Sequence, residues 1–291
     1  MEYSISPLTS ENPHYIPFLE AARVHYQWKH VFFLESIDGW LKAFGRHAMP
    51  FLLTTKEMYL PLLQARGHFF FSLSDFLYGD GPCPEQSPLV LPHLDSFSFC
   101  FPLSFPSSHK QIPQREYFLI KQDMMTFPSY LSSLGAGWRK ELRRRKNKWK
   151  DLSCVQIDSS HFLEGLPQFF LLHRKRFGPS FYNSKELLVY VYYLIKTQPQ
   201  SILVFELKQE ESLGHIVWIK MGHRLNLFTL LSNAPEERNA GKALVYFSLE
   251  KLFSLPGSYE INFDTGYGHY KEHWAKQTRD YVLYIPTQSQ P

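Results

Sequence analysis

The stretch that most constrains the fold is residues 225–274, near the C-terminal end of the 291-residue chain. Residues 225–231 form an apolar run of the kind that favours a β-strand. Residues 241–253 carry apolar side chains too densely for a surface stripe, which predicts a mostly buried helix. A second short strand is expected at 260–263, with a polar, aromatic, glycine-containing loop after it. The predicted order is therefore strand, helix, strand and loop.

The turn at residues 238–243, RNAGKA, opens the expected helix. A helix N-terminus presents unpaired N–H groups and the positive end of the helix dipole, which suits a pyrophosphate. The glycine of this turn lets a ligand approach the backbone closely. Ordinary turn chemistry accounts for the same glycine, so both interpretations stay open.

The loop at residues 264–274, DTGYGHYKEHW, follows the second strand and combines a carboxylate, two tyrosines, two histidines and a lysine. Functional sites are common in loops at strand ends. The composition also fits a solvated loop around one buried tryptophan, with Asp264 closing an Asx turn. His269 and His273 have no third ligand at suitable spacing, so no metal site is expected.

A strongly basic segment lies at residues 130–152. Its apolar residues fall near one helical face, and Gly135 and Gly137 predict a break between two helices. The basic face is either solvated or binds phosphates, such as the 3′-phosphate of CoA, a tRNA backbone or an anionic lipid-linked substrate. Contact with an anionic membrane surface is a further interpretation. The basic residues are Arg139, Lys140, Arg143, Arg144, Arg145, Lys146, Lys148 and Lys150.

These segments together resemble the GNAT acyltransferase superfamily, in particular the branch of CelD-like acetyltransferases and FemAB-type aminoacyltransferases. Residues 238–243 follow the pattern Arg/Gln-x-x-Gly-x-Gly/Ala, which in that superfamily cradles the CoA pyrophosphate. Phe263-Asp264-x-Gly266 with Tyr270-Lys271 resembles the CelD-like ending. Residues 130–144 resemble the basic helix of that branch.

The resemblance implies an α+β, GNAT-like fold in two tandem domains. Residues 1–115 would form a degenerate GNAT-like domain and residues 116–291 the acyltransferase domain, with 111–115 as the linker. Within the second domain we expect antiparallel strands at 202–207, 214–220 and 225–231, helices at 161–177 and 184–197, and a last strand at 281–285. The N-terminal half is expected to hold a strand pair at 50–54 and 58–63, strands at 68–73 and 96–101, helical patches at 15–26 and 37–44, and a turn at 78–82.

The activity implied is N-acyl transfer from acyl-CoA, as a co-substrate and not a permanently bound cofactor, to an amine. Tyr270 would protonate the leaving group, Lys271 would stabilise negative charge, and Asp264 would orient the acceptor amine or Lys271. A backbone N–H near 228–231 would contact the oxyanion. The donor would bind to Arg238, Asn239, Gly241, Lys242 and Ala243, and phosphates to Arg139, Arg143 and Arg144.

Two alternatives remain. A FemAB-like enzyme would take its acyl group from aminoacyl-tRNA and act on a peptidoglycan precursor, but residues 160–200 leave no room for the long helical hairpin common in such proteins. A non-catalytic GNAT-like module would bind nucleic acid or anionic lipid through residues 139–150. The acceptor is either an amine-bearing small molecule or a cell-envelope precursor.

Composition narrows the class of protein further. Apolar residues make up 44% of the chain, which indicates a folded protein, and the net charge of +4 permits a polyanionic partner without demanding one. The three cysteines are widely spaced, so neither a disulfide framework nor a zinc site is expected. Because no signal peptide and no run of about 18 apolar residues occurs, we expect a cytoplasmic protein without a transmembrane helix.

Overall fold

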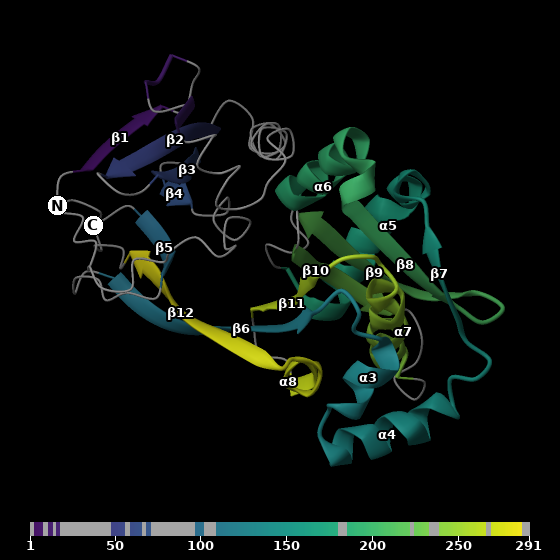
Figure 1. Ribbon diagram of the computed structural model, residues 1–291. Helices are drawn as coiled ribbons and strands as arrows, with labels where there is room; N and C mark the ends of the chain where they lie inside the picture. The colour runs from purple at the N-terminus through teal and green to yellow at the C-terminus, as the bar shows by residue number, and fades with distance from the viewer. Residues whose placement is uncertain are drawn as a thin grey trace. The chain divides into compact units, whose positions relative to one another are not determined.

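A computed structural model describes twelve ranges of the chain and divides the chain into two compact units (Figure 1). Unit 1 is Met1–Arg115 with Arg279–Pro291, and unit 2 is Glu116–Thr278. The described residues are 3–7, 11–13, 16–17, 48–55, 59–65, 68–70, 97–101, 109–179, 185–221, 224–232, 239–265 and 269–286.

The sequence predicts a linker at 111–115, and the structure corrects that prediction. These residues belong to the long strand β6 (His109–Lys121), whose last six residues, 116–121, fall in unit 2. β6 pairs with β11 (Tyr259–Thr265) through its residues 116–121, which belong to unit 2. The last strand, β12 (Gln277–Pro286), covers the expected range 281–285, and its residues from Arg279 onward belong to unit 1.

The described strands of unit 1 form a sheet in which most neighbouring strands are antiparallel. The predicted pair at 50–54 and 58–63 is confirmed as β2 and β3, and the apolar runs at 68–73 and 96–101 contain β4 and β5. β4 and β5 are parallel, and β12 pairs antiparallel with β5. Apart from residues 16–17, the helical patches at 15–26 and 37–44 and the turn at 78–82 lie outside the described residues. The strands are β1 (Tyr3–Pro7), β2 (Ala48–Thr55), β3 (Tyr59–Ala65), β4 (His68–Phe70) and β5 (Phe97–Phe101).

The sheet of unit 2 runs β6-β11-β10-β9-β8-β7. Only β10 and β11 are parallel; the other neighbours pair antiparallel, so the three expected antiparallel strands before the helix are confirmed. Gly214 of β9 lies opposite Ser232 of β10. The strands not yet given are β7 (Ser153–Ile157), β8 (Ile202–Lys208), β9 (Ser212–Met221) and β10 (Arg224–Ser232).

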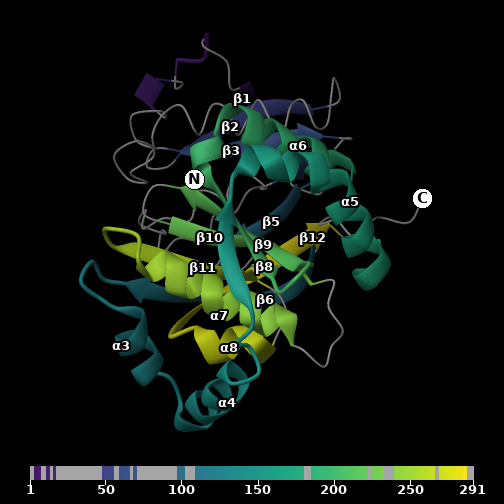
Figure 2. The same cartoon turned by 90° about the vertical axis from the view of Figure 1, so that its right-hand side faces the viewer.

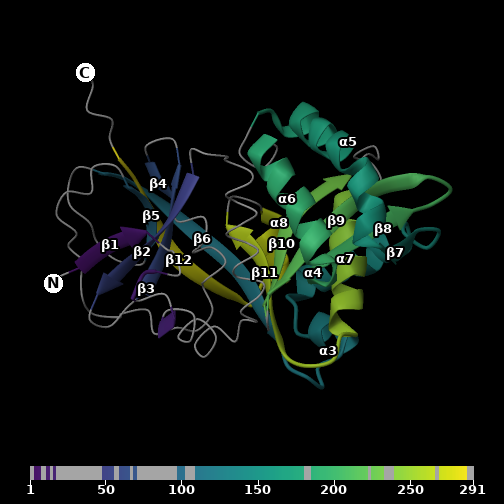
Figure 3. The same cartoon turned by 90° about the horizontal axis from the view of Figure 1, so that it is seen from above.

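Helices cover both faces of this sheet (Figure 2 and Figure 3). Neighbouring residues of a strand point to opposite faces. On β9, Ile216 and Trp218 pack with the cluster around α7, whereas His215 contacts Phe162 and Phe169 of α5. α5 and α7 therefore lie on opposite faces. The helices are α3 (Phe127–Ser132), α4 (Ala136–Lys146), α5 (Ser159–Phe177), α6 (Lys185–Thr197), α7 (Ala240–Phe253) and α8 (His269–Trp274), with a 3-10 turn at Pro199–Ser201.

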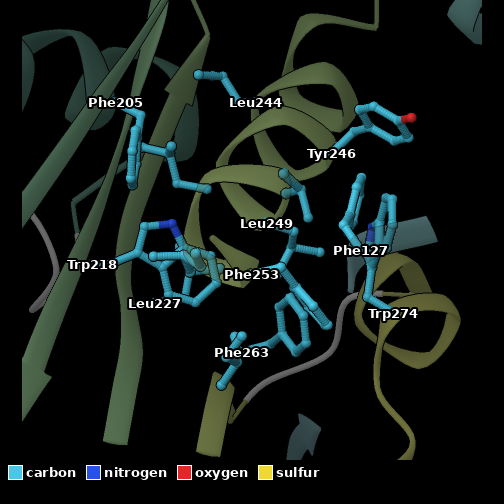
Figure 4. Packing of buried hydrophobic residues seen from close by; sticks show 14 of the residues in the cluster. Phe127, Phe205, Trp218, Leu227, Leu244, Tyr246, Leu249, Phe253, Phe263 and Trp274 are labelled. Atoms are coloured by element: carbon cyan, nitrogen blue, oxygen red, sulfur yellow. The ribbon is translucent and has the colours of Figure 1, made fainter. Parts of the chain in front are cut away.

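The main hydrophobic cluster surrounds α7 (Figure 4). Leu244 and Leu249 are fully buried, as the dense apolar pattern predicts. On the sheet side the helix meets Trp218 and Phe263, and on the other side it meets the aromatic residues of α3 and α8. Because apolar partners lie on both sides, this helix lacks the polar stripe of a surface helix.

The break predicted between two helices in the basic segment is confirmed. Thr126 caps α3 by accepting a hydrogen bond from the Ser129 N–H at 3.3 Å, and Pro128 occupies the first turn, where its missing N–H costs nothing. α4 begins directly after Gly135. The Arg139 guanidinium donates to the Ser132 carbonyl at the end of α3, which fixes the corner between the two helices.

The expected loop at 264–274 is partly wrong, because residues 269–274 form the helical turn α8. The expectation of one buried tryptophan is confirmed: Trp274 is fully buried, and its carbonyl accepts a hydrogen bond from the buried Tyr130 hydroxyl. The Trp138 ring meets the Trp274 ring edge-on at 5.5 Å. These partners from α3 and α4 order a segment whose own composition gives little reason to be helical.

A glycine on β9 is required by close packing against β10. Gly214 has φ +149°, and a Cβ there would lie 2.3 Å from the Leu231 carbonyl oxygen. We expect Gly214→Ala to destabilise the protein by roughly 2–3 kcal/mol, since backbone atoms have to move. Gly165→Ala is the control: it lies within α5 with open space around it, and alanine there should stabilise by about 0.5–1 kcal/mol. Urea unfolding of both variants measures their free energies of unfolding. Equal unfolding midpoints would contradict the requirement for glycine at position 214.

Candidate functional site

The parallel strands β10 and β11 separate toward their carboxyl ends. Their pairing covers only Arg224–Asn226 against Glu260–Asn262, although the strands continue to Ser232 and Thr265. On its other edge β10 carries a register shift between Leu227 and Thr229 against β9. Past Asn226, the described part of β10 therefore faces β11 with backbone groups that no strand pairing uses. Such groups can bond a ligand.

Helix α7 begins at this same end of the sheet, directly after β10 in the chain. Asn239 precedes it in the left-handed conformation (φ 47°), and its carbonyl accepts hydrogen bonds from the N–H groups of Lys242 and Ala243 at 2.9 and 3.1 Å. A Cβ on Gly241 would meet Leu230 of β10 at 3.5 Å, which is ordinary contact. Ala243 is fully buried. The positive end of the helix dipole is thus placed at the separating strands.

Of the residues predicted to bind the donor, Lys242 lies apart. Its Nζ is 5.7 Å from the centre of the Trp138 ring of α4. Burial, with Arg145 adding repulsion, lowers the pKa of Lys242, and Glu141 opposes that change. The side chain therefore packs against α4, whereas Asn239, Gly241 and Ala243 form the turn itself. Arg238 lies outside the described residues.

The residues predicted for catalysis follow β11. Asp264 lies at the carboxyl end of that strand; its side chain is outside the described set. Tyr270 and Lys271 are half-buried in α8, and Tyr270 packs against the main hydrophobic cluster. Because β11 is parallel to β10, Asp264 lies at the same end of the sheet as the start of α7, and Tyr270 and Lys271 follow it in the chain in α8.

A cavity of about 430 Å³ lies between the α3–α4 corner and α8. The Trp138 and His273 rings stack in its wall with centroids 4.4 Å apart, and Glu272 accepts a hydrogen bond from the Tyr117 hydroxyl at 3.1 Å. Lys276 binds the Ser133 carbonyl across the corner. Sequence reasoning missed Glu272 and Lys276 as lining residues, because neither stands at a spacing that marks a site.

The three arginines predicted to bind phosphate do not act as one group. Arg144 pairs with Glu141 (Nε to Oε2, 3.0 Å), and this hydrogen bond, together with Arg145, lowers the pKa of Glu141 to about 2. Arg139 and Arg143 line a different surface, a second cavity shared with α3 and α7. Within the described residues, no group of three His, Cys, Asp or Glu side chains is placed to hold a metal ion.

A buried ion cluster, which the sequence did not indicate, lies where β10 and β11 still pair. Arg224 contacts Glu116 of β6 and Glu260 of β11, the latter at 2.8 Å from Nε. Asn262 donates to Glu260 at 3.1 Å. All four residues are less than a tenth exposed. The ion pairs form only when β6, β11 and β10 are in register. The cluster therefore fixes the alignment of β10 and β11 at the end where they still pair.

Comparison with known proteins shows the fold. No protein-family model and no curated protein sequence matches the chain. Among solved structures, a tandem GNAT protein from the clavulanic acid biosynthesis pathway, without AcCoA, matches with TM-score 0.53 and 10% identity, covering 100% of this chain and 99% of that one. A conserved protein of unknown function from Bacteroides thetaiotaomicron matches with TM-score 0.51 and 9% identity, covering 98% of this chain and 100% of that one. FemX matches with TM-score 0.49 and 8% identity, covering 90% of this chain and 95% of that one.

The chain therefore has a GNAT-like fold, with α+β architecture and a mixed sheet. At about a tenth identity, the likeness concerns the fold alone. In the part of the chain that the structure describes, no helix combines the length and the apolar character needed to cross a membrane.

The buried ion cluster yields a prediction about stability. Arg224→Leu leaves Glu116 and Glu260 buried without their shared cation, so we expect a loss of about 3–5 kcal/mol. Arg144→Leu is the control, because it also removes an arginine paired with glutamate but at an exposed position. Its unfolding midpoint should stay near that of the wild type. Chemical unfolding compares the two; similar midpoints would show that the buried cluster does not hold the strands.

Proposed function

We propose that this protein is an N-acyltransferase that moves an acyl group from acyl-CoA to an amine. The observation that carries the proposal is the separation of β10 from β11 beyond Asn226 and Asn262, with α7 starting at the same end. Such a gap admits an extended donor chain. The helix start offers N–H groups to its pyrophosphate.

The donor would bind along β10 and at the turn before α7. Its pyrophosphate would contact the backbone of Asn239 and Gly241, with Arg238 adding charge. Ala243, which is buried with its N–H bonded to the Asn239 carbonyl, would only support this turn from below. Its thioester carbonyl would accept a hydrogen bond from a β10 N–H in residues 228–231, where the register shift alters the strand edge. Packing of Lys242 on Trp138 suggests that this lysine acts mainly by holding α4 against α7.

Transfer itself would take place between β10 and α8. The neutral acceptor amine attacks the thioester carbon, and the carbonyl oxygen becomes negative. As the C–S bond breaks, the nitrogen loses one proton to solvent. Lys271 would stabilise that charge, Tyr270 would give a proton to the departing thiolate, and Asp264 would orient the acceptor or Lys271. The cavity lined by Trp138 and Glu272 is a suitable place for the acceptor, since a carboxylate attracts an ammonium group.

The tandem organisation is part of the proposal. The tandem GNAT protein named above covers this chain over its whole length, which supports a degenerate GNAT-like domain in residues 1–115 and an acyltransferase domain from 116 onward. The similarity is one of fold, so the proposal extends to architecture and not to substrate.

Donor binding is testable by thermal unfolding. Acetyl-CoA at about 100 times its dissociation constant should add about 2.7 kcal/mol and raise the melting temperature by several degrees. Gly241→Glu places a carboxylate where the pyrophosphate would sit and should abolish the shift. Gly165→Glu, with the same charge change in open space on α5, should keep it. A shift with a tRNA pool but none with acetyl-CoA would favour the aminoacyl-tRNA donor and contradict the proposal.

The role of Lys271 is testable separately. Lys271→Ala should retain the acetyl-CoA shift and lose at least about 100-fold in the rate of CoA release with an amine acceptor, the effect expected on removing one charge-stabilising group. Lys251→Ala, which removes an exposed lysine in the last turn of α7 that lines neither cavity, is the control. If both variants acetylate at the wild-type rate, Lys271 has no catalytic role.

A further inference from the structure

A second cavity, of about 260 Å³, lies between α3, α4 and the middle of α7. Leu131 of α3 and Leu142 of α4 give it apolar walls, and Tyr246 of α7 reaches it from the main hydrophobic cluster. Arg139, Arg143 and Lys146 of α4 complete the lining on the polar side. It shares no lining residue with the cavity beside α8.

The three cations form one row on α4, because positions four and three residues apart are neighbours on a helix. Glu141, the acidic residue of this helix, forms ion pairs with Arg144 and Arg145. Among the residues that the structure describes, Arg139, Arg143 and Lys146 have no carboxylate partner. Arg139 uses one N–H on the Ser132 carbonyl, which holds its guanidinium at the cavity. This row therefore presents positive charge that no carboxylate in the described part of the chain neutralises.

Tyr246 supplies an independent observation. Only 4% of the residue is exposed, yet its hydroxyl points outward from the cluster (Figure 4) and makes no hydrogen bond to any described residue. Burial and the nearby Glu250 raise the pKa of Tyr246, so the hydroxyl keeps its proton and can donate. A hydroxyl in the wall of a cavity can donate a hydrogen bond to a ligand that enters it. Its place beside three cations indicates an anionic partner.

The chemistry of the lining defines the ligand class. Two guanidinium groups and an ammonium suit a phosphate, which accepts several charge-assisted hydrogen bonds at once. The leucine walls suit an apolar body attached to it. A bare inorganic anion would leave those walls in water, and a purely apolar molecule would leave the cations unused.

We propose that this cavity binds the phosphate monoester group of a ligand with an apolar body, through Arg139, Arg143, Lys146 and the Tyr246 hydroxyl. The apolar part lies against Leu131 and Leu142. The proposal does not depend on the acyltransferase activity, because no residue of the site belongs to the donor turn or to α8.

Binding of 1-naphthyl phosphate, measured by isothermal titration calorimetry, tests the proposal. It should bind at least about tenfold more tightly than inorganic phosphate and than 1-naphthol, since each of these offers only half of the interactions. Equal binding of naphthyl phosphate and inorganic phosphate, or no binding of the naphthyl ester, would overturn it.

Variants locate the site. Arg143→Ala removes an exposed side chain, so folding should be preserved, and affinity should fall about tenfold. Tyr246→Phe removes only the hydroxyl and should weaken binding severalfold. Lys140→Ala is the matched control: an exposed cation of the same helix outside the cavity. Equal losses in Arg143→Ala and Lys140→Ala would show general charge attraction and overturn the site.

Vesicles distinguish the source of the phosphate. Sedimentation with phosphatidylcholine vesicles containing phosphatidic acid, sensitive to Tyr246→Phe, would identify a lipid phosphate monoester as the ligand. Naphthyl phosphate binding without such sedimentation would identify a soluble ligand. Equal sedimentation with phosphatidylserine vesicles, unaffected by Tyr246→Phe, would contradict a phosphate monoester site.

Discussion

Burial of α7 on two sides is the constraint on which the described part of unit 2 depends. The sheet covers one side with Trp218 and Phe263, and α3 and α8 cover the other with Phe127 and Trp274. Fixing this helix fixes where its first N–H groups point. It also brings α4 next to the helix start through the contact of Lys242 with Trp138. The hydrophobic core thus positions the polar groups of the candidate site.

The parallel strands give that site its opening. Near their starts, Arg224 is buried between Glu116 and Glu260, and such a cluster is stable only when all partners are present. Beyond Asn226 and Asn262 the pairing ends. One end of the strand pair is therefore held in register, and the other end is left with backbone groups that no strand pairing uses. A rigid frame beside an unpaired edge is the arrangement that the proposed transfer site needs.

Much of unit 2 could be predicted from the sequence because its patterns are local. The run at 225–231, the dense apolar helix at 241–253 and the break at Gly135 and Gly137 follow from periodicity and turn chemistry. Parts that depend on distant partners could not be predicted. α8 is ordered by Tyr130 and Trp138, which lie more than a hundred residues earlier. β6 runs through 111–115, a stretch that resembles a linker, and its end pairs with the distant strand β11.

The same distinction applies to the site. Sequence patterns singled out Gly241 and Lys271 as candidates, but spacing alone could not separate Arg144, which pairs with Glu141, from Arg139 and Arg143, which face a cavity. Nor could it find the ion cluster around Arg224, whose members come from three strands.

Hydrogen–deuterium exchange with and without acetyl-CoA tests the central claim most directly, because it reports where the donor lies without requiring an acceptor. A donor between the separating strands should protect backbone amides in 228–232 and 240–244. Exchange in α5, on the other face of the sheet, should not change. Unchanged exchange in both segments at saturating acetyl-CoA, or protection confined to 139–146, would contradict a donor site at the start of α7.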